Sequence, residues 1–239
     1  MDMYFNVNSF RSLNSPYAWY NFACVRIDFV WVDTRENKLI MLLVDQNREK
    51  MVVVVPSSLI GRYLERGMEG RLYSINHFKL NSTPDDFPKY EGYNFVDDQY
   101  VIIVNQATRF TLLEPVIENH FPTYPLVESI EYLVRNPRQR NLIDVVGKVI
   151  DGRLLHHDCA IDLLLQDQSG YVIQLILNDG PEALPFKLAR SIQEKWIIYV
   201  SRVKYRSRGG MNFLDSTSIS RVAFEPVMAE ANAIRAIYG

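Results

Sequence analysis

The sequence has little cysteine and no long hydrophobic run. Its 239 residues include two cysteines, Cys24 and Cys159, which excludes a disulfide framework and a multi-cysteine zinc ribbon and is typical of a reducing compartment. The longest apolar run, residues 51–55, is far shorter than the roughly 20 residues of a transmembrane helix. The polar N-terminus does not resemble a secretory signal. We therefore expect an intracellular protein that binds no membrane.

A large excess of one charge is also absent. The 26 Lys and Arg residues oppose 28 Asp and Glu residues, a net charge of −2. This total argues against a nucleic-acid binder, because such proteins displace phosphate counterions with a positive surface. The total conceals an asymmetry: residues 1–134 carry 12 basic and 17 acidic residues, net −5, and residues 135–239 carry 14 and 11, net +3. The C-terminal part is the better candidate for an anionic partner.

Sequence motifs of common catalytic and metal sites are lacking too. The chain contains no phosphate-binding G-x-x-x-x-G-K, no G-x-S-x-G, no H-E-x-x-H and no Cys-x-x-Cys. The run at residues 156–159, His-His-Asp-Cys, favours a polar turn over a metal site, because consecutive strand residues point to opposite faces. The acidic pairs at 85–86 and 97–98 lie in turn-rich sequence. We predict a non-catalytic protein without a cofactor or metal.

What the sequence does contain is an internal repeat. Each half holds three β-like runs in the same order, with a turn after the second run. These runs are residues 22–25, 39–47 and 51–55 in the first copy, and 146–149, 161–170 and 171–177 in the second. Asp167 follows Asp45 by 122 residues. That spacing is too long for a solenoid repeat and indicates a duplicated domain.

Each copy continues with a helix and two further strands. The helices are predicted at residues 57–64, with a serine cap, and 181–194, where apolar residues recur every four positions. The further strands are predicted at residues 72–80 and 100–104 in the first copy and 196–208 and 211–219 in the second. Three strands, one helix and two strands is the layout of an OB-fold, a small five-stranded Greek-key barrel. We predict a mainly β chain of two tandem OB-folds.

The predicted domain boundaries follow from a break between the copies. Prolines at 122 and 125 interrupt the chain, apolar residues at helical spacing follow from Leu126 to Val134, and a basic segment closes the connection. We assign residues 1–121 to the first OB domain, 122–140 to an inter-domain helix and basic linker, and 141–239 to the second domain. The second domain is predicted to end in a helix that begins near Pro226.

A row of basic residues in the second copy is the strongest sign of a ligand. The cations alternate with other residues, so a period of two places all of them on one face of one strand. They are Arg202, Lys204, Arg206 and Arg208. Like charges side by side repel, and a phosphate backbone over the row would relieve this. The alternative is a set of solvated charges that protects a sheet edge from aggregation.

Binding of single-stranded nucleic acid also needs aromatic faces, on which bases stack for about 1–3 kcal/mol each. Candidates occur near turns in both copies. They are Tyr90, Tyr93 and Phe95, close to Pro88 and Gly92, and Tyr205 and Phe213, which flank Gly209-Gly210. For each of these rings, burial in the core is the alternative.

Several short segments, in order along nearly the whole chain, carry a family resemblance. They are WYNFACV at 19–25, LVD at 43–45, GRLY at 70–73, NLIDVVG at 141–147 and the closing helix at 226–235. With these segments the chain resembles the two central DNA-binding OB domains of the large subunit of replication protein A, particularly the shortened plant-type relatives. The resemblance implies non-catalytic binding of single-stranded DNA without strong sequence preference. It also implies a nuclear role in replication, repair or recombination.

The resemblance places the family's stacking aromatics near Leu39 and Tyr93 in the first copy and near Leu177 and Tyr205 in the second. Both leucines depart from the family pattern, so half of the expected stacking is missing. Cys24 stands where the family often has arginine, whereas the second copy has Lys148 at the equivalent position. We therefore expect weaker affinity than the family norm, with the second copy and the basic linker dominating DNA binding.

Together these observations define the candidate DNA-contacting residues. They are Lys38, Tyr93, Phe95, Arg138, Arg140, Lys148, Arg202, Lys204, Tyr205, Arg206, Arg208 and Phe213. The expected partners are single-stranded DNA and, beyond it, replication or repair proteins or a second copy of the chain. The zinc-bearing domain that assembles the family's trimer does not fit this sequence. The alternative function is an OB-fold protein-interaction adaptor with weak or absent DNA affinity, which the acidic first copy favours.

Overall fold

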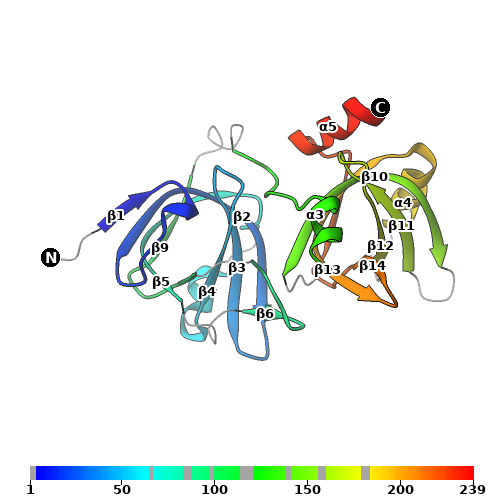
Figure 1. Cartoon of the computed structure of the whole chain (residues 1–239). Helices are drawn as coiled ribbons and strands as arrows, with labels where there is room; N and C mark the ends of the chain where they lie inside the picture. Colours follow the sequence, from blue (N-terminus) through cyan, green and yellow to red (C-terminus); the bar gives the residue numbers. More distant parts are fainter. Residues whose placement is uncertain are drawn as a thin grey trace. The chain divides into compact units, whose positions relative to one another are not determined.

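The computed structural model describes residues 4–64, 67–82, 88–96, 100–113, 121–137, 141–155, 160–178 and 184–239. The chain divides into two compact units (Figure 1). The first unit comprises Met1–Tyr90 and Asn94–Leu126, and the second comprises Glu91–Tyr93 and Val127–Gly239. The main division, after Leu126, falls inside the segment 122–140 that the sequence marks as a connection.

Five strands of the first unit form a ring. In ring order they are β2 (Trp19–Asp33), β3 (Lys38–Val44), β4 (Lys50–Val55), β8 (Val101–Ile103) and β5 (Leu72–Asn81). An antiparallel pairing of β2 with β5 joins the two ends of this order. Two strands extend the sheet beyond the ring: β1 (Tyr4–Val7) beside β2, and β9 (Arg109–Leu112) beside β5.

Short elements complete the first unit. They are the 3-10 helices η1 (Phe10–Ser12) and η2 (Ser57–Leu59), helix α1 (Ile60–Tyr63), and the small hairpin strands β6 (Lys89–Tyr90) and β7 (Tyr93–Asn94). The helical turn predicted at residues 57–64 is confirmed as η2 followed by α1. It ends at Tyr63, whose hydroxyl donates to the carbonyl of Thr108 at 2.6 Å and so fixes the helix against the loop before β9.

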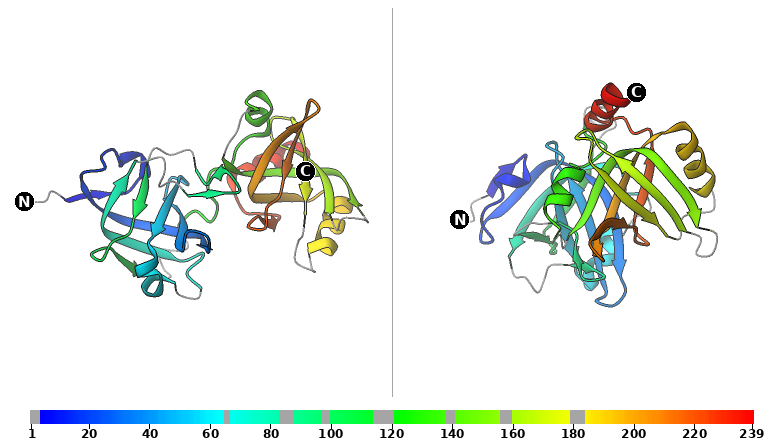
Figure 2. Two further views of the ribbon diagram at one scale, coloured as in Figure 1. Left: turned by 90° about the horizontal axis from the view of Figure 1, so that it is seen from below. Right: turned by 45° about the vertical axis from the view of Figure 1, so that its right-hand side comes forward.

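The second unit repeats this arrangement. Its ring order is β10 (Leu142–Leu155), β11 (Ala160–Gln166), β12 (Val172–Leu177), β14 (Met211–Asp215) and β13 (Ile197–Arg208), closed by an antiparallel pairing of β10 with β13. The remaining elements are α3 (Ile130–Arg135), α4 (Leu184–Glu194), β15 (Arg221–Phe224) and α5 (Ala229–Tyr238). Figure 2 shows the curled sheets of the two units from two further directions.

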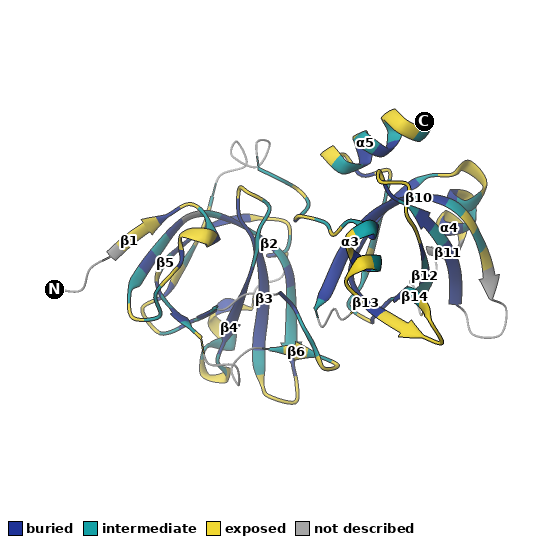
Figure 3. Ribbon diagram, viewed as in Figure 1, coloured by how far each residue is buried: buried dark blue, intermediate teal, exposed yellow. Residues whose placement is uncertain are grey.

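The interior of each ring is filled by alternate side chains of its strands. Figure 3 colours much of β3 and β11 as buried. In the first unit these include Leu39, Met41 and Leu43, each 0% exposed. In the second unit Leu177 is 5% exposed and also belongs to the core. Leu39 and Leu177 stand where the resemblance places stacking aromatics, and burial inside the rings explains why aliphatic residues suit both positions.

In both units an aspartate stabilises the turn between the second and third ring strands. The Asp45 carboxylate accepts the backbone N–H groups of Asn47 and Glu49 at 2.8 and 2.9 Å, and that of Phe10 at 3.0 Å. In the second unit, Asp167 accepts the N–H of Ser169 at 2.9 Å and that of Ile130, the first residue of α3, at 2.7 Å. The aspartate repeat seen in the sequence therefore ties each hairpin to the segment preceding its ring.

Candidate nucleic-acid interface

The predicted row of four exposed cations does not form. Strand β13 carries a bulge between Val200 and Val203, where two residues oppose one on β10, and Arg202 lies in it with a φ of 56°. Arg202 is 2% exposed, and its Nε donates to the carbonyl of Ile219 at 2.8 Å. The prediction that Arg202 faces DNA is therefore wrong, because the bulge breaks the period-two alternation and buries the side chain.

The other three cations of the row share one face but differ in exposure. Lys204, Arg206 and Arg208 lie opposite Asp215, Phe213 and Met211 of β14, and directly paired residues of an antiparallel sheet point to the same side. Lys204 is only 3% exposed. Its ammonium group pairs with the Glu91 carboxylate and lies 5.8 Å from the centre of the Tyr93 ring, both within the second unit. The prediction of Lys204 as a freely presented cation is also wrong.

Two predicted stacking rings are buried instead. Tyr205 is 3% exposed and belongs to the core of the second unit, paired across the sheet with Leu214. Burial raises the pKa of its phenol, and the hydroxyl has no hydrogen-bond partner within the described ranges. Phe95 is 2% exposed and packs against Phe29 and Trp31, with ring centres 6.5 and 5.8 Å apart. Stacking on either ring is thus wrong, and the core alternative holds.

The outer face of the first ring is covered by its own chain. Phe29 pairs with Leu42 and Trp31 with Ile40, so these side chains share the outward face of β2 and β3. Leu42 and Ile40 are nevertheless each 1% exposed. The Phe95 ring lies against Phe29 and Trp31, and the Tyr90 ring against Trp31, so these two rings cover part of this face. A strand buried on both sides has a continuous apolar sequence, as β3 does.

The outer face of the second ring is open and carries polar groups. Phe213 on β14 pairs with Arg206 on β13 and with Gln174 on β12, so the three side chains lie abreast on one face. Phe213 and Gln174 are half-buried and Arg206 is exposed. The Arg206 Nε donates to Asp215 Oδ2 at 3.0 Å. An aromatic ring between a guanidinium group and an amide is an arrangement that can stack a planar ligand and hydrogen-bond its substituents.

The hairpin between β13 and β14 extends this face at one end (Figure 3). Gly209 and Gly210 have φ of 60° and 79°, which glycine adopts without strain, and they turn the chain tightly between two exposed residues. Arg208 makes no hydrogen bond or ion pair with any residue that the structure describes, and Met211 is 69% exposed. Arg208 is therefore a cation available to an external anion.

A second arginine reaches the open face from β10. Arg153 Nε lies 3.1 Å from Asp162 Oδ2, and Gln174 Nε2 donates to Asp162 Oδ1 at 2.8 Å. Asp162 thereby links Arg153 to the amide beside Phe213. The sequence interpretation missed Arg153 and Gln174 because their common face depends on strand register. The available signal was Gln174 itself, the one polar residue in the apolar sequence of β12.

The remaining predicted DNA-binding residues lie elsewhere. Lys38 Nζ pairs with Glu36 at 2.8 Å in the first unit. Lys148 donates to the carbonyl of Tyr238 near the end of α5, so its ammonium group serves that helix rather than the open face. The linker residues Arg138 and Arg140 lie outside the described residues. Of the predicted residues, the structure brings together Arg206, Arg208 and Phe213.

Comparisons with known proteins gave matches to solved structures and none to family models or curated sequences. A scan against protein-family models gave no match, and a search of curated proteins gave none. Among solved structures, the chain is similar to a chain of a replication protein A heterotrimer bound to single-stranded DNA, with a TM-score of 0.52 and 19% identity over 97% of this chain and 55% of that one. The chain is a tandem OB-fold.

Other solved structures give weaker similarity. They include the Ifi202 HINa domain with 20-base-pair double-stranded DNA (TM-score 0.42, 12% identity, 86% of this chain and 96% of that one) and the p202 HIN1 domain with a 12-mer double-stranded DNA (0.44, 12%, 85% and 92%). This tandem OB-fold spans little more than half the length of the replication protein A chain that it matches. The similarity confirms the predicted fold class.

The open face occupies the usual ligand position of the fold. OB-folds bind oligonucleotides or oligosaccharides on the face of their second and third strands and the adjoining loops. In the second OB-fold these strands are β11 and β12, with the β13–β14 hairpin beside them. Within the described ranges, His, Cys, Asp and Glu form no group of three that could hold a metal ion, and no helix there is long and apolar enough to span a bilayer. The run 156–159 lies outside those ranges.

Proposed function

We propose that this protein binds single-stranded DNA, without catalysing a reaction, on the open face of its second OB-fold. The observation that carries the proposal is Phe213, which lies between the exposed Arg206 and the half-buried Gln174 on the outer face of the sheet. Arg208, unpaired within the described ranges, stands at the hairpin next to it. This combination of a ring and cations is the one that binding of a single strand requires.

Two arginines of the open face can position the phosphate backbone of the strand, while Phe213 stacks on a base. Arg206 and Arg208 are two residues apart on one strand face and are suited to consecutive phosphates. Arg206 is held by Asp215, which also accepts from Asn178 Nδ2 at 2.8 Å, so its guanidinium group is oriented before a strand binds. The same carboxylate cancels part of its charge. We therefore expect moderate affinity.

An unpaired strand fits this face better than a duplex. The Phe213 ring offers its surface to a base, and a base in a duplex is already stacked on both sides. The similarity to a replication protein A chain bound to single-stranded DNA supports this choice. On the same grounds we propose a nuclear role in replication, repair or recombination, which microscopy of the tagged full chain would test by showing nuclear or cytoplasmic fluorescence.

The first OB-fold has a lesser part in this proposal. Its equivalent face carries the rings of Tyr90 and Phe95, and Ile40, Leu42 and Val52 on it are at most 2% exposed. Residues 1–134 also carry a net charge of −5, which repels a polyanion. These two observations favour the alternative that the first unit contacts another protein, so the binding measurement must separate the units.

Fluorescence anisotropy of labelled single-stranded DNA at two salt concentrations tests the proposal. The variant Arg206→Glu/Arg208→Glu should bind at least tenfold more weakly than the wild type. Its salt dependence should be shallower by about 0.7 in slope for each phosphate that the variant no longer neutralises. The matched control is Lys187→Glu/Arg190→Glu on α4, which changes the net charge equally and should bind more tightly than the first variant. Equal affinity and slope for wild type and Arg206→Glu/Arg208→Glu would overturn the proposal and favour the protein-interaction adaptor.

A further inference from the structure

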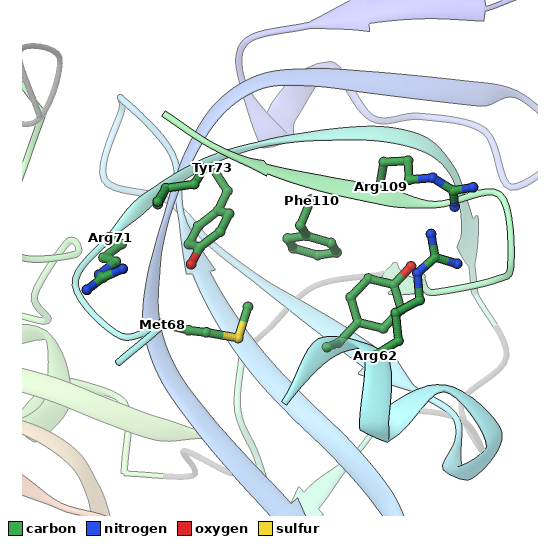
Figure 4. A pocket seen from close by; sticks show the side chains of 8 residues that line it. Arg62, Met68, Arg71, Tyr73, Arg109 and Phe110 are labelled. Carbon is green, nitrogen blue, oxygen red and sulfur yellow. The ribbon is translucent and has the colours of Figure 1, made fainter. Parts of the chain in front are cut away.

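A pocket of about 260 Å³ opens in the first unit, away from the face discussed above (Figure 4). It lies between α1, the beginning of β5 and the edge strand β9. The lining residues are Arg62, Tyr63, Met68, Arg71, Tyr73, Arg109, Phe110 and Leu112. Three of them are arginines, three are aromatic and none is acidic. The DNA-binding proposal gives this pocket no role.

Two of the arginines are anchored to one loop. Arg62 donates from its guanidinium group to the carbonyl of Gln106 at 3.0 Å, and Arg109 donates to the same carbonyl at 2.6 Å and to that of Thr108 at 3.0 Å. Their positive charges are not cancelled, since carbonyl oxygens are neutral acceptors. Each guanidinium group has five N–H donors, so donors are left for a ligand.

The third arginine differs from the other two because its side chain is not anchored to any described residue. Arg71 is exposed and makes no hydrogen bond or ion pair through its side chain with any described residue. The nearest carboxylate in sequence, Glu69, uses Oε1 to accept the backbone N–H of Val30 at 2.8 Å. Figure 4 shows Arg71 across the pocket from Arg62 and Arg109, beyond Tyr73. Arg62 and Arg109 therefore form the anion site; no described lining residue is acidic, and their planar guanidinium forks match phosphate oxygens.

The pocket also has an aromatic wall. The Phe110 ring is held edge to face by Tyr63 and Tyr73, with ring centres 5.6 and 6.3 Å away and interplanar angles of 69° and 68°. Tyr63 and Tyr73 are buried, and Phe110 is half-buried. Figure 4 shows the Phe110 ring between Tyr73 on one side and Arg62 and Arg109 on the other. A fixed ring with one accessible surface is a stacking platform for a planar group.

We propose that this pocket binds a nucleoside 5′-phosphate, with the base against Phe110 and the phosphate on Arg62 and Arg109. Inorganic phosphate would leave the aromatic wall unused, and a phosphotyrosine side chain would leave much of the 260 Å³ empty. The nucleotide can come from a free mononucleotide or from the phosphorylated 5′ end of a strand. The site does not depend on DNA binding by the second unit.

Isothermal titration of the full chain with deoxyadenosine monophosphate tests the site. The nucleotide should bind, and deoxyadenosine without its phosphate should bind at least tenfold more weakly. Arg62→Ala and Arg109→Ala should each reduce nucleotide affinity about tenfold, as removal of a charge-assisted hydrogen bond does. Arg11→Ala is the matched control, since Arg11 belongs to the same unit, is exposed and lies outside the pocket. It should leave nucleotide affinity unchanged.

Further measurements test the base contact separately from the phosphate contact. They also distinguish a free mononucleotide from the phosphorylated 5′ end of a strand. Phe110→Leu should weaken binding of the nucleotide at least fivefold and leave that of inorganic phosphate unchanged. In the Arg206→Glu/Arg208→Glu background, preference for a 5′-phosphorylated oligonucleotide over the mononucleotide identifies a strand end, and equal binding identifies a free nucleotide. Absence of nucleotide binding by wild type, an unchanged affinity in Arg109→Ala, or tighter binding of a phosphotyrosine peptide would overturn the proposal.

Discussion

The carboxylate of Asp144 accepts a hydrogen bond from the backbone N–H of Arg202 at 2.9 Å. This bond supports the bulge that removes Arg202 from the predicted cationic row. The first unit has the same device: Asn21 Oδ1 accepts the N–H of His77, a residue with a φ of 60°, at 3.0 Å. Both units therefore stabilise a positive-φ residue in the last strand of the ring order (β5 and β13) through a side chain of the first (β2 and β10).

Replacing Asp144 should destabilise the second unit. Asp144 is 1% exposed and also lies within hydrogen-bonding distance of the Tyr199 hydroxyl, at 3.2 Å. Asp144→Ala leaves buried donors without an acceptor, and we expect the free energy of unfolding to fall by about 1–3 kcal/mol. Urea denaturation measures this. Asn21→Ala is the comparison: its hydrogen bond to His77 is exposed, so the loss should be smaller, and an equal or larger loss would contradict this account.

The two turn aspartates should contribute similar amounts to the free energy of unfolding of their units. Asp45 and Asp167 are 0% and 4% exposed, and each accepts a backbone N–H from the segment preceding its ring, from Phe10 and Ile130 respectively. Hydrogen bonds to a charged acceptor contribute about 1.5–3 kcal/mol each. Asp45→Ala and Asp167→Ala should therefore each lower the denaturation midpoint of their own unit. A variant that unfolds at the wild-type urea concentration would refute this role.

Substitutions at two phenylalanines should separate effects on DNA binding from effects on folding stability. Phe213→Ala removes a half-buried ring from the open face and should weaken binding of single-stranded DNA by about 1–3 kcal/mol per stacked base. Phe95→Ala removes a ring that is 2% exposed and should cost about 3–5 kcal/mol of folding free energy. Anisotropy and urea denaturation measured on both variants check this. The assignment fails if Phe95→Ala weakens DNA binding while the protein keeps wild-type stability.

Cys24 should react slowly with alkylating agents at neutral pH. Burial raises the pKa of its thiol, and the positive charge of Arg26 only partly opposes this rise. A raised pKa means a smaller thiolate fraction at a given pH, and the thiolate is the reactive form. In a Cys159→Ser background, iodoacetamide should modify the folded protein more slowly than the urea-unfolded protein at pH 8. The difference should narrow as the pH rises through the raised pKa, and equal rates at pH 8 would refute the shift.

The fold was accessible from the sequence because it depends on local patterns that occur twice. Turn aspartates 122 residues apart, strands of β-branched residues and one helical segment per copy predict the order of the elements without knowledge of distant contacts. The serine cap predicted for residues 57–64 is wrong, because no side chain caps η2 or α1. The sequence also indicated the contrast between the covered outer face of the first ring and the open outer face of the second. Residues 39–44 are apolar without interruption, typical of a strand buried on both sides, whereas β12 interrupts its apolar run with Gln174.

The site was accessible only in part, since exposure depends on three-dimensional contacts. Alternation along β13 predicts one face for Arg202, Lys204, Arg206 and Arg208, but a single bulge removes the first, and an ion pair with Glu91 buries the second. Strand register alone brings Gln174 and Arg206 to either side of Phe213. The sequence by itself determined the duplicated fold, because repeated short-range patterns specify it. Only the tertiary structure decided which cations and rings face solvent, because bulges, register and covering segments act over distances that periodicity does not record.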